Sequence, residues 1–451
     1  MTISTNKLKV LLFGWCGVGN TGSEAKLLAT IDDVKKAIGK NRIEKMGVIS
    51  LGPVDERRYV EDPNIEIYSF LPTSEGGLTS LYKLIAGERW DLLFLCEGST
   101  YLDRYNDLFL WAFMMAARIQ KMRGGKVVGY SNDCGHLKPY NQRGARNTLN
   151  NYVDLQMVRN PDARTRMQQY GVIREIHLTA DDAYLYPLPP KEYREKLLKE
   201  LNLGNKPIIS IATKEFFILP MIPKLYPGKD KVPLDFLYKK ELNYTPMISK
   251  DVYIPKIYLE MPEDKLKKSE EYKKEMTQYA DYLVEKFGAN VLLIGMASFE
   301  GDGINAREIY DSMKNKKDAR WIPSHIYNTK DIKALLCSSK YLITTRYHAS
   351  VLSSTAGVPM IAISSDTRLE AVFRELDIMD LYLEVKIDPP TIPENLYGTL
   401  MEKTKILANR EKEIQKKIKE ADKNFVKRAE QNSILLKQWF DKEFERYKKA
   451  V

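Results

Sequence analysis

Short apolar runs alternate with longer segments of helical periodicity through the first half of the chain. Six runs predict buried strands: Leu8–Phe13, Met46–Ser50, Glu66–Phe70, Asp91–Cys96, Lys126–Tyr130 and Leu155–Arg159. Apolar residues recur at helical spacing between several of them, most clearly in Glu24–Ile38, Leu108–Met122 and Pro161–Tyr170. Strands that alternate with helices of this length are typical of βαβ units, so the pattern predicts a parallel sheet.

A second alternating block follows a cluster of prolines at Pro187, Pro189 and Pro190. Its predicted strands are Pro207–Ala212, Val291–Ile294, Tyr341–Thr344 and Met360–Ile363. Its predicted helices are Asp264–Phe287, Asp331–Ser338, His348–Ala356 and Thr367–Leu376. We therefore expect two α/β domains, residues 1–190 and 191–385, with the proline cluster at their boundary.

Two segments do not follow this alternation. Residues 214–262 lack clear periodicity and are rich in aromatic and lysine residues, which fits either an acceptor-binding flap or additional packing. Residues 386–451 form a C-terminal extension in which apolar residues such as Ile414, Ile418, Phe425 and Leu436 recur at helical spacing. This extension predicts one long amphipathic helix, or two.

The composition fits a folded globular protein and excludes several other classes. Of the 451 residues, 44% are hydrophobic and 29% charged, unlike a disordered chain, collagen or a small disulfide scaffold. No apolar run reaches the roughly 18 residues of a membrane span, and Met1–Lys9 is too polar for a signal peptide. The four cysteines lie far apart in the sequence, so we expect reduced thiols in a cytoplasmic protein.

The net charge of +10 is concentrated in two segments. Residues 401–451 contain 15 basic and 9 acidic side chains, and residues 214–274 contain 13 lysines and 10 acidic side chains. A nucleic-acid-binding protein is expected to carry its basic residues across a binding face, so we expect no nucleic-acid partner. The basic C-terminal helix fits either packing on the first domain or peripheral contact with an anionic membrane.

Gly17, Gly19 and Gly22 follow the first predicted strand and satisfy the pattern G-x-G-x-x-G. In this position glycines let a backbone approach an anion at a helix N-terminus. The second predicted strand, however, ends without the acidic residue that a dinucleotide site requires, which leaves a tight turn as the alternative. Asn20 and Glu24 are the polar residues expected at this carboxyl edge of the sheet.

Other polar residues follow later strands of the first predicted domain. Glu97 and Ser99 follow one strand, Asp133 and His136 the next, and Arg159 ends the last one. Ligands of open α/β sheets bind at these carboxyl ends. An arginine there suits a phosphate or carboxylate, although local capping, salt bridging or surface exposure would also account for Glu97 and His136.

Arg346, Tyr347 and His348 stand where a strand of the second predicted domain runs into a helix. An arginine that binds an anion beside a histidine that exchanges protons is an arrangement typical of catalysis. Arg368 follows the next strand and reaches the same edge. The alternative is that these arginines pair with acids such as Asp366.

The sequence resembles the polysaccharide pyruvyl transferase family over about residues 9–376. The motif N-x-G-D/S-E-A matches Asn20–Ala25, and the motif R-L-H-A followed by G-x-P matches Arg346–Ala349 and Gly357–Pro359. Three segments depart from the family pattern: Cys96-Glu97 replaces two glycines, Asn160 and Ala163 replace an acid and a serine, and Arg368 replaces a lysine.

The resemblance implies two Rossmann-like domains that face a cleft, as in GT-B glycosyltransferases. It also implies transfer of the pyruvyl group of phosphoenolpyruvate to two hydroxyls of a sugar, in a polysaccharide or its lipid-linked precursor, with release of phosphate. The residues assigned to catalysis are His348, Arg346, Glu97 and Asp133. Those assigned to substrate binding are Arg159, Arg368, Asn20, Gly22, Glu24, Ser99, His136 and Tyr347. No metal and no cofactor is expected; the partners are phosphoenolpyruvate, a saccharide and, in a homo-oligomer, a second copy of the chain.

Three alternatives remain open at this point. A nucleotide-sugar glycosyltransferase of the same architecture would also place cationic residues in the second domain. An enzyme that uses NAD would employ the glycine loop at Gly17–Gly22. A non-catalytic protein that binds anions or glycans would account for the departures at Cys96-Glu97, Asn160 and Arg368.

Overall fold

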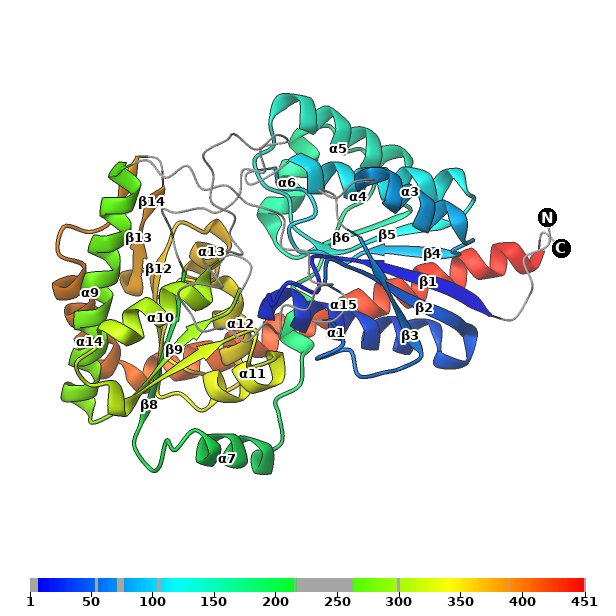
Figure 1. Ribbon diagram of the computed structural model, residues 1–451. Helices are drawn as coiled ribbons and strands as arrows, with labels where there is room; N and C mark the ends of the chain where they lie inside the picture. The colour runs from blue at the N-terminus through cyan, green and yellow to red at the C-terminus, as the bar shows by residue number, and fades with distance from the viewer. Residues whose placement is uncertain are drawn as a thin grey trace.

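The chain folds into two α/β domains, each with its own parallel sheet, as the computed structural model shows (Figure 1). The structure describes residues 7–52, 56–70, 77–103, 107–214, 216, 263–297, 301–387 and 389–449. The segment 214–262, for which an acceptor-binding flap was one interpretation, lies outside the described residues except for Lys214 and Phe216. In the described part of the chain, no helix has the length and apolar character needed to cross a membrane.

The first sheet has seven parallel strands in the order β3-β2-β1-β4-β5-β6-β7. These are β1 (Leu8–Phe13), β2 (Ile43–Ser50), β3 (Ile65–Ser69), β4 (Leu92–Leu95), β5 (Lys126–Asn132), β6 (Leu155–Val158) and β7 (His177–Leu178). Helices α3 (Gly77–Gly87), α4 (Asp107–Met122), α5 (Pro139–Asn151) and α6 (Pro161–Gln169) cover one face, and α1 (Thr21–Ile38) lies on the other. Leu11 and Phe13 pack into the first of these layers, whereas Val10 and Leu12 pack into the second, as the alternation of side chains along a strand requires.

The second sheet has six parallel strands in the order β10-β9-β8-β11-β12-β13. These are β8 (Ile208–Thr213), β9 (Asn290–Gly295), β10 (Ala319–Pro323), β11 (Tyr341–Thr344), β12 (Met360–Ser364) and β13 (Tyr382–Glu384). Its helices are α7 (Lys191–Glu200), α9 (Glu263–Phe287), α10 (Asp302–Ser312), α11 (Thr329–Cys337), α12 (Tyr347–Ser354), α13 (Thr367–Glu375) and α14 (Leu396–Asn409). A short hairpin of β14 (Lys386–Ile387) and β15 (Pro390–Thr391) follows β13. In each sheet the strand that comes first in the sequence, β1 or β8, lies between two groups of strands that extend in opposite directions across the sheet. Ligands of such folds bind at the carboxyl ends of the strands, near the place where the strand order reverses.

The final helix α15 (Glu411–Lys449) joins the two domains. Its residues Ile414 and Ile418 belong to the core of the second domain, whereas Leu436 and Phe440 belong to the core of the first. Between them, Asn432 donates from its Nδ2 to the carbonyl of Ala180 at 3.0 Å. The amphipathic pattern predicted for the C-terminal extension is therefore a pair of helices, α14 and α15, and the second spans both domains (Figure 1).

The predicted strands and helices are present with small shifts of their ends, and the two-domain α/β fold is confirmed. Several elements escaped the sequence pattern: α3, α5, α7, α10, β7, β10, β13 and the hairpin β14–β15. Helix α5 shows why, because its buried residues include Asn141 and Thr148 beside Ala145 and Leu149, so its inner face has little apolar periodicity.

Candidate active site between the two domains

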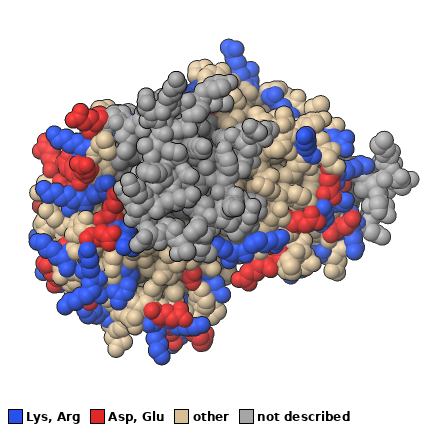
Figure 2. Space-filling model, viewed as in Figure 1, with Lys and Arg blue, Asp and Glu red and all other residues tan. Residues whose placement is uncertain are grey.

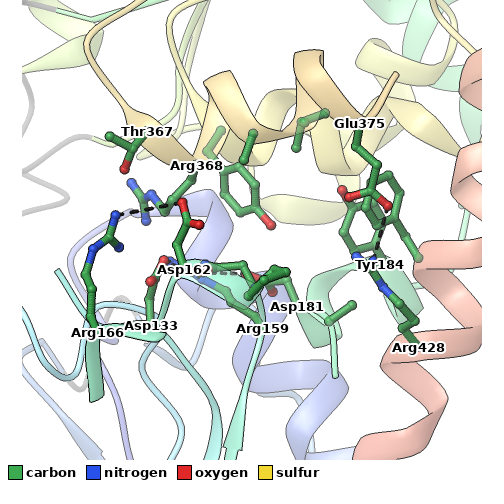
Figure 3. A pocket seen from close by; sticks show the side chains of 17 residues that line it. Asp133, Arg159, Asp162, Arg166, Asp181, Tyr184, Thr367, Arg368, Glu375 and Arg428 are labelled. Carbon is green, nitrogen blue, oxygen red and sulfur yellow. Dashed lines mark hydrogen bonds and ion pairs between the residues drawn. The ribbon is translucent and has the colours of Figure 1, made fainter. Parts of the chain in front are cut away.

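A pocket lies between the two domains, where their strands end, and the final helix forms one of its walls (Figure 3). The first domain contributes Asp133, Arg159, Asn160, Pro161, Asp162, Arg166, Ala180, Asp181 and Tyr184. The second domain contributes Tyr347, Thr367, Arg368, Ala371, Val372 and Glu375, and α15 contributes Phe425 and Arg428. The N-termini of α6, α12 and α13 all supply lining residues, and a helix N-terminus favours an anion.

Arg159 is the buried cation of this pocket and is only 3% exposed. Its Nε and Nη2 donate to Oδ2 of Asp133 at 3.1 and 3.0 Å, and its Nη1 donates to Oδ2 of Asp181 at 2.6 Å. Burial by itself lowers the pKa of Arg159, but the charges of these two carboxylates raise it above its usual value. Arg159 therefore stays charged and is held in one orientation.

Tyr347 brings the cations of the two domains together. The guanidinium of Arg159 lies 5.2 Å from the centre of the Tyr347 ring, and that of Arg368 lies 5.3 Å from it. Arg368 donates from Nε to both carboxylate oxygens of Asp366, at 2.8 and 3.1 Å. Partial burial raises the pKa of the Asp366 carboxyl, but the charge and hydrogen bonds of Arg368 hold it below its usual value. Arg368 therefore both pairs with Asp366 and lines the pocket.

His348 lies beside the buried Asp181, with Nε2 of the imidazole 3.6 Å from Oδ2 of the carboxylate. Burial lowers the pKa of His348, while Asp181 opposes this shift and the charges of Arg159 and Arg368 add to it. Burial raises the pKa of Asp181, but the charges of Lys26 and Arg159 and the contact with His348 together hold it well below its usual value. At neutral pH the site therefore pairs a neutral imidazole with an ionised carboxylate.

Gly22 explains how His348 fits against the first domain. A Cβ atom at this glycine would stand 2.0 Å from Nδ1 of His348, a separation that no side chain tolerates. The glycine of the N-x-G motif thus leaves room for the histidine of the R-x-H motif, which comes from the other domain.

Arg346 does not line the pocket. It donates from Nε to Oδ2 of Asp302 at 2.6 Å and from Nη2 to the second oxygen, so the fork binds one carboxylate that is fully buried at the start of α10. We expected this arginine to bind the anionic substrate; in the structure it anchors the turn that carries Tyr347 and His348.

The predicted residues of the glycine loop connect the domains. Asn20 caps α1, its side chain accepting from the backbone N–H of Gly22 at 3.1 Å. Glu24 accepts from the hydroxyl of Thr329 in the second domain at 2.6 Å. The carbonyl of Gly19 accepts from the hydroxyl of Ser324 at 2.5 Å. Glu24 and the Gly19 carbonyl therefore connect the two domains, and neither Asn20 nor Glu24 lines the pocket.

Glu97 organises neighbouring loops and does not line the pocket either. It accepts from the backbone N–H of Trp15 at 3.0 Å and from the N–H and hydroxyl of Ser99 at 3.0 and 2.9 Å. His136 is exposed and also lies away from the lining residues. Of the four residues assigned to catalysis, the structure brings Asp133 into the pocket and His348 beside its wall.

Most residues that line the pocket were not assigned from the sequence, among them Asp181, Arg166, Tyr184, Glu375 and Arg428. Asp181 follows β7, and its burial between Arg159 and His348 depends on contacts with residues that are distant in the sequence. Arg166 lies on α6 and donates to the carbonyl of Cys134 at 2.9 Å, and Figure 3 shows it on the same side of the pocket as Arg368. In the described part of the chain, no group of three or more His, Cys, Asp or Glu side chains could hold a metal ion.

Figure 2 shows how the charged side chains of the described residues are distributed on one face of the molecule. Lys and Arg side chains lie among Asp and Glu side chains over both domains. Exposed ion pairs such as Lys416–Glu420 and Lys437–Asp441 show this mixing along α15.

Comparison with known proteins agrees with this architecture. The family model "Polysaccharide pyruvyl transferase" matches residues 56–367, whereas no curated protein matches the sequence.

Three solved structures have a similar fold. Anabaena Alr3699/HepE in complex with UDP-glucose is 13% identical, with a TM-score of 0.54 over 98% of this chain and 100% of that chain. UDP-GlcNAc 2-epimerase from Neisseria meningitidis is 12% identical, with a TM-score of 0.51 over 93% and 99% of the two chains. Sucrose-phosphate synthase (tll1590) from Thermosynechococcus elongatus is 11% identical, with a TM-score of 0.50 over 99% and 100%. At these identities the similarity concerns the fold, and the predicted GT-B-like arrangement is confirmed.

Proposed function

Because this chain belongs to the polysaccharide pyruvyl transferase family, we propose that it transfers the pyruvyl group of phosphoenolpyruvate to two hydroxyls of one sugar. The product is a cyclic ketal, and phosphate is released. The acceptor is a saccharide of a polysaccharide or of its lipid-linked precursor. Family membership supports the class of transferase; the donor and the ketal chemistry are our proposal.

The observation that carries this proposal is the meeting of Arg159 and Arg368 over the ring of Tyr347. Phosphoenolpyruvate holds a phosphate and a carboxylate close together, and arginine binds both groups through paired N–H donors. The pocket adds a third cation, Arg166, and the N-termini of α6 and α13. These guanidinium groups and helix N-termini supply N–H donors for the two anionic groups of the donor.

The reaction needs one proton delivered and two removed. The methylene carbon of phosphoenolpyruvate takes up a proton, and a sugar hydroxyl adds to the neighbouring carbon and loses its own. A second hydroxyl of the same sugar then displaces phosphate, which leaves with the second proton. Positioned acid–base groups contribute about 10²–10⁴-fold to such transfers.

We assign this proton transfer to His348, whose neutral imidazole accepts a proton beside the ionised Asp181. Asp181 orients the ring and stabilises its protonated form, and it also holds Arg159. Asp133 lines the pocket but serves chiefly as the second partner of Arg159. Arg346 is a positioning residue, since it holds the start of α12 through Asp302.

A phosphate-release assay tests the proposal. The purified protein is mixed with phosphoenolpyruvate and a panel of saccharides that contain galactose, mannose or N-acetylmannosamine, and a parallel set contains UDP-sugars instead of phosphoenolpyruvate. We expect phosphate release only with phosphoenolpyruvate and an acceptor. Turnover of a UDP-sugar, with no release from phosphoenolpyruvate, would favour the glycosyltransferase alternative.

A further inference from the structure

The pocket extends along one face of α13, well beyond its arginine-rich end. Thr367, Arg368, Ala371, Val372 and Glu375 all line it, and this spacing places them on one side of the helix. From Arg368 to Glu375 the helix advances by about 10 Å at 1.5 Å per residue. A three-carbon phosphate is roughly 6 Å long, given bonds near 1.5 Å. Phosphoenolpyruvate at the arginine-rich end therefore leaves the other end to a second ligand.

We call this second part the outer end of the pocket; it consists of Tyr184, Glu375, Phe425 and Arg428. Figure 3 shows Tyr184, Glu375 and Arg428 close to one another. Arg428 of α15 lies with its Nη1 3.2 Å from Oε1 of Glu375, and these side chains are 36% and 43% exposed. The rings of Tyr184 and Phe425 stack at 4.7 Å with an angle of 10° between their planes. The guanidinium of Arg428 lies 5.0 Å from the centre of the Phe425 ring.

The ion pair of the outer end is able to accept a ligand. Only one hydrogen bond joins its two partners, and a partly exposed pair of this kind contributes little to stability, so ligand groups can replace it at small cost. Nε of Arg428 is buried and makes no hydrogen bond within the described part of the chain. A carboxylate that accepts and a guanidinium that donates, side by side, match the hydroxyls of a sugar ring.

The charge of the outer end fits a neutral ligand. Glu375 and Arg428 balance each other, so this end carries no net positive charge that would attract a second anion. A neutral ligand with several hydroxyls fits it better.

The position of these residues in the chain agrees with a role in specificity. Arg159, Arg166 and His348 lie within the segment 56–367 that matches the family, and Arg368 directly follows it. Of the outer end, Tyr184 lies within this segment, whereas Glu375, Phe425 and Arg428 lie beyond it. The outer end is thus built mainly from a part of the chain outside the matched segment, which suits recognition of the substrate that gives an enzyme its own specificity.

We propose that the outer end is the binding subsite for the saccharide acceptor, whose ring hydroxyls bind Glu375 and Arg428. This inference rests on the proposed pyruvyl transfer, since it assigns the two substrates of that reaction to the two ends of one pocket.

The experiment compares Glu375→Gln and Arg428→Gln with a matched control, Arg374→Gln. Arg374 neighbours Glu375 on α13 but pairs with Glu370 on the surface and does not line the pocket. In the phosphate-release assay we expect each pocket variant to raise the KM for the acceptor at least tenfold, with the KM for phosphoenolpyruvate changed less than twofold. The control should match the wild type, and thermal unfolding should show that all variants fold.

A second measurement keeps this inference separate from the proposed reaction. Saturation-transfer NMR detects binding of the methyl glycosides of galactose, mannose and N-acetylmannosamine without any turnover. We expect at least one glycoside to bind the wild type and the control, and to bind both pocket variants at least tenfold more weakly. If the glycosides bind in this way but no phosphate is released, the proposed pyruvyl transfer is wrong, whereas the saccharide subsite is supported. Equal binding by the pocket variants, or no binding of any glycoside to the wild type, would overturn the subsite.

Discussion

His348 of the second domain lies with its Nε2 3.6 Å from Oδ2 of Asp181, a buried carboxylate of the first domain. The same oxygen accepts from Nη1 of Arg159 at 2.6 Å. One carboxylate therefore fixes both the arginine of the pocket and the histidine to which we assign proton transfer, and it does so across the domain interface. The site is complete only when the two domains are in register.

Asp181→Asn keeps the shape of this side chain but removes its charge. Because Asp181 is what raises the pKa of His348 against the effect of burial, its loss should lower that pKa further. We expect the acidic limb of the kcat/KM profile against pH to move to lower pH, and kcat to fall. Asp162→Asn is the control, since Asp162 lines the pocket but is largely exposed and does not contact His348. An acidic limb that stays in place in Asp181→Asn would show that Asp181 does not act through His348.

Gly22→Ala should impair the site without disturbing the helix that contains it. Alanine favours a helix over glycine by up to about 1 kcal/mol, but the new Cβ would stand 2.0 Å from Nδ1 of His348 and must displace the imidazole. We expect phosphate release to fall at least about tenfold, which corresponds to about 1.4 kcal/mol of transition-state stabilisation.

Two comparisons make this prediction specific. Gly87→Ala places its methyl group in open space and should leave the activity unchanged. In the background of His348→Ala, Gly22→Ala should have no additional effect, because the two substitutions act on the same group. Additive losses in the double variant would contradict the steric explanation.

Arg346→Lys should reduce stability more than it reduces binding of phosphoenolpyruvate. The ammonium cannot reproduce the fork on the buried Asp302, and losing one charged hydrogen bond there should cost about 2 kcal/mol in the free energy of unfolding. Arg374→Lys, in a surface pair with Glu370, should cost less than about 0.5 kcal/mol. Urea unfolding measures both. If Arg346→Lys leaves the stability unchanged but greatly raises the KM for phosphoenolpyruvate, Arg346 binds the anionic substrate.

The titration of Asp33 should lower the free energy of unfolding as the pH rises from about 4 to about 7. Burial raises the pKa of this carboxyl to about 7 in the folded protein, even though it accepts a hydrogen bond from Tyr130 at 2.7 Å. The unfolded chain releases this proton near pH 4, so between these values the folded state binds more protons and loses stability with rising pH.

The test is the difference in unfolding free energy between the wild type and Asp33→Asn, which stays neutral. The wild type should lose stability relative to this variant by at most about 1.4 kcal/mol per pH unit over that range. Asp32→Asn, at the exposed neighbouring position, should show no such trend. A constant difference between the wild type and Asp33→Asn would refute the raised pKa.

The sequence allowed the fold to be predicted because its strands are strongly apolar and its polar residues follow them directly. β11 is buried throughout, and Tyr347 and His348 follow it within four residues. The partners of the site residues were not predictable in this way. Nothing near Arg346 indicates that Asp302, which lies 44 residues away, takes up its guanidinium. The sequence suggested a catalytic role for Glu97. Its hydrogen bonds with the backbone of Trp15 and Ser99 could not be predicted, because they depend on how two loops pack.

The most direct test of the account is phosphate release from phosphoenolpyruvate in the presence of saccharide acceptors, measured for the wild type and for His348→Ala. We predict release that requires both substrates in the wild type. In His348→Ala it should fall by about 100-fold or more, with an unchanged unfolding temperature. Release that is equally fast in a folded His348→Ala variant, or a wild type that turns over only UDP-sugars, would contradict the account.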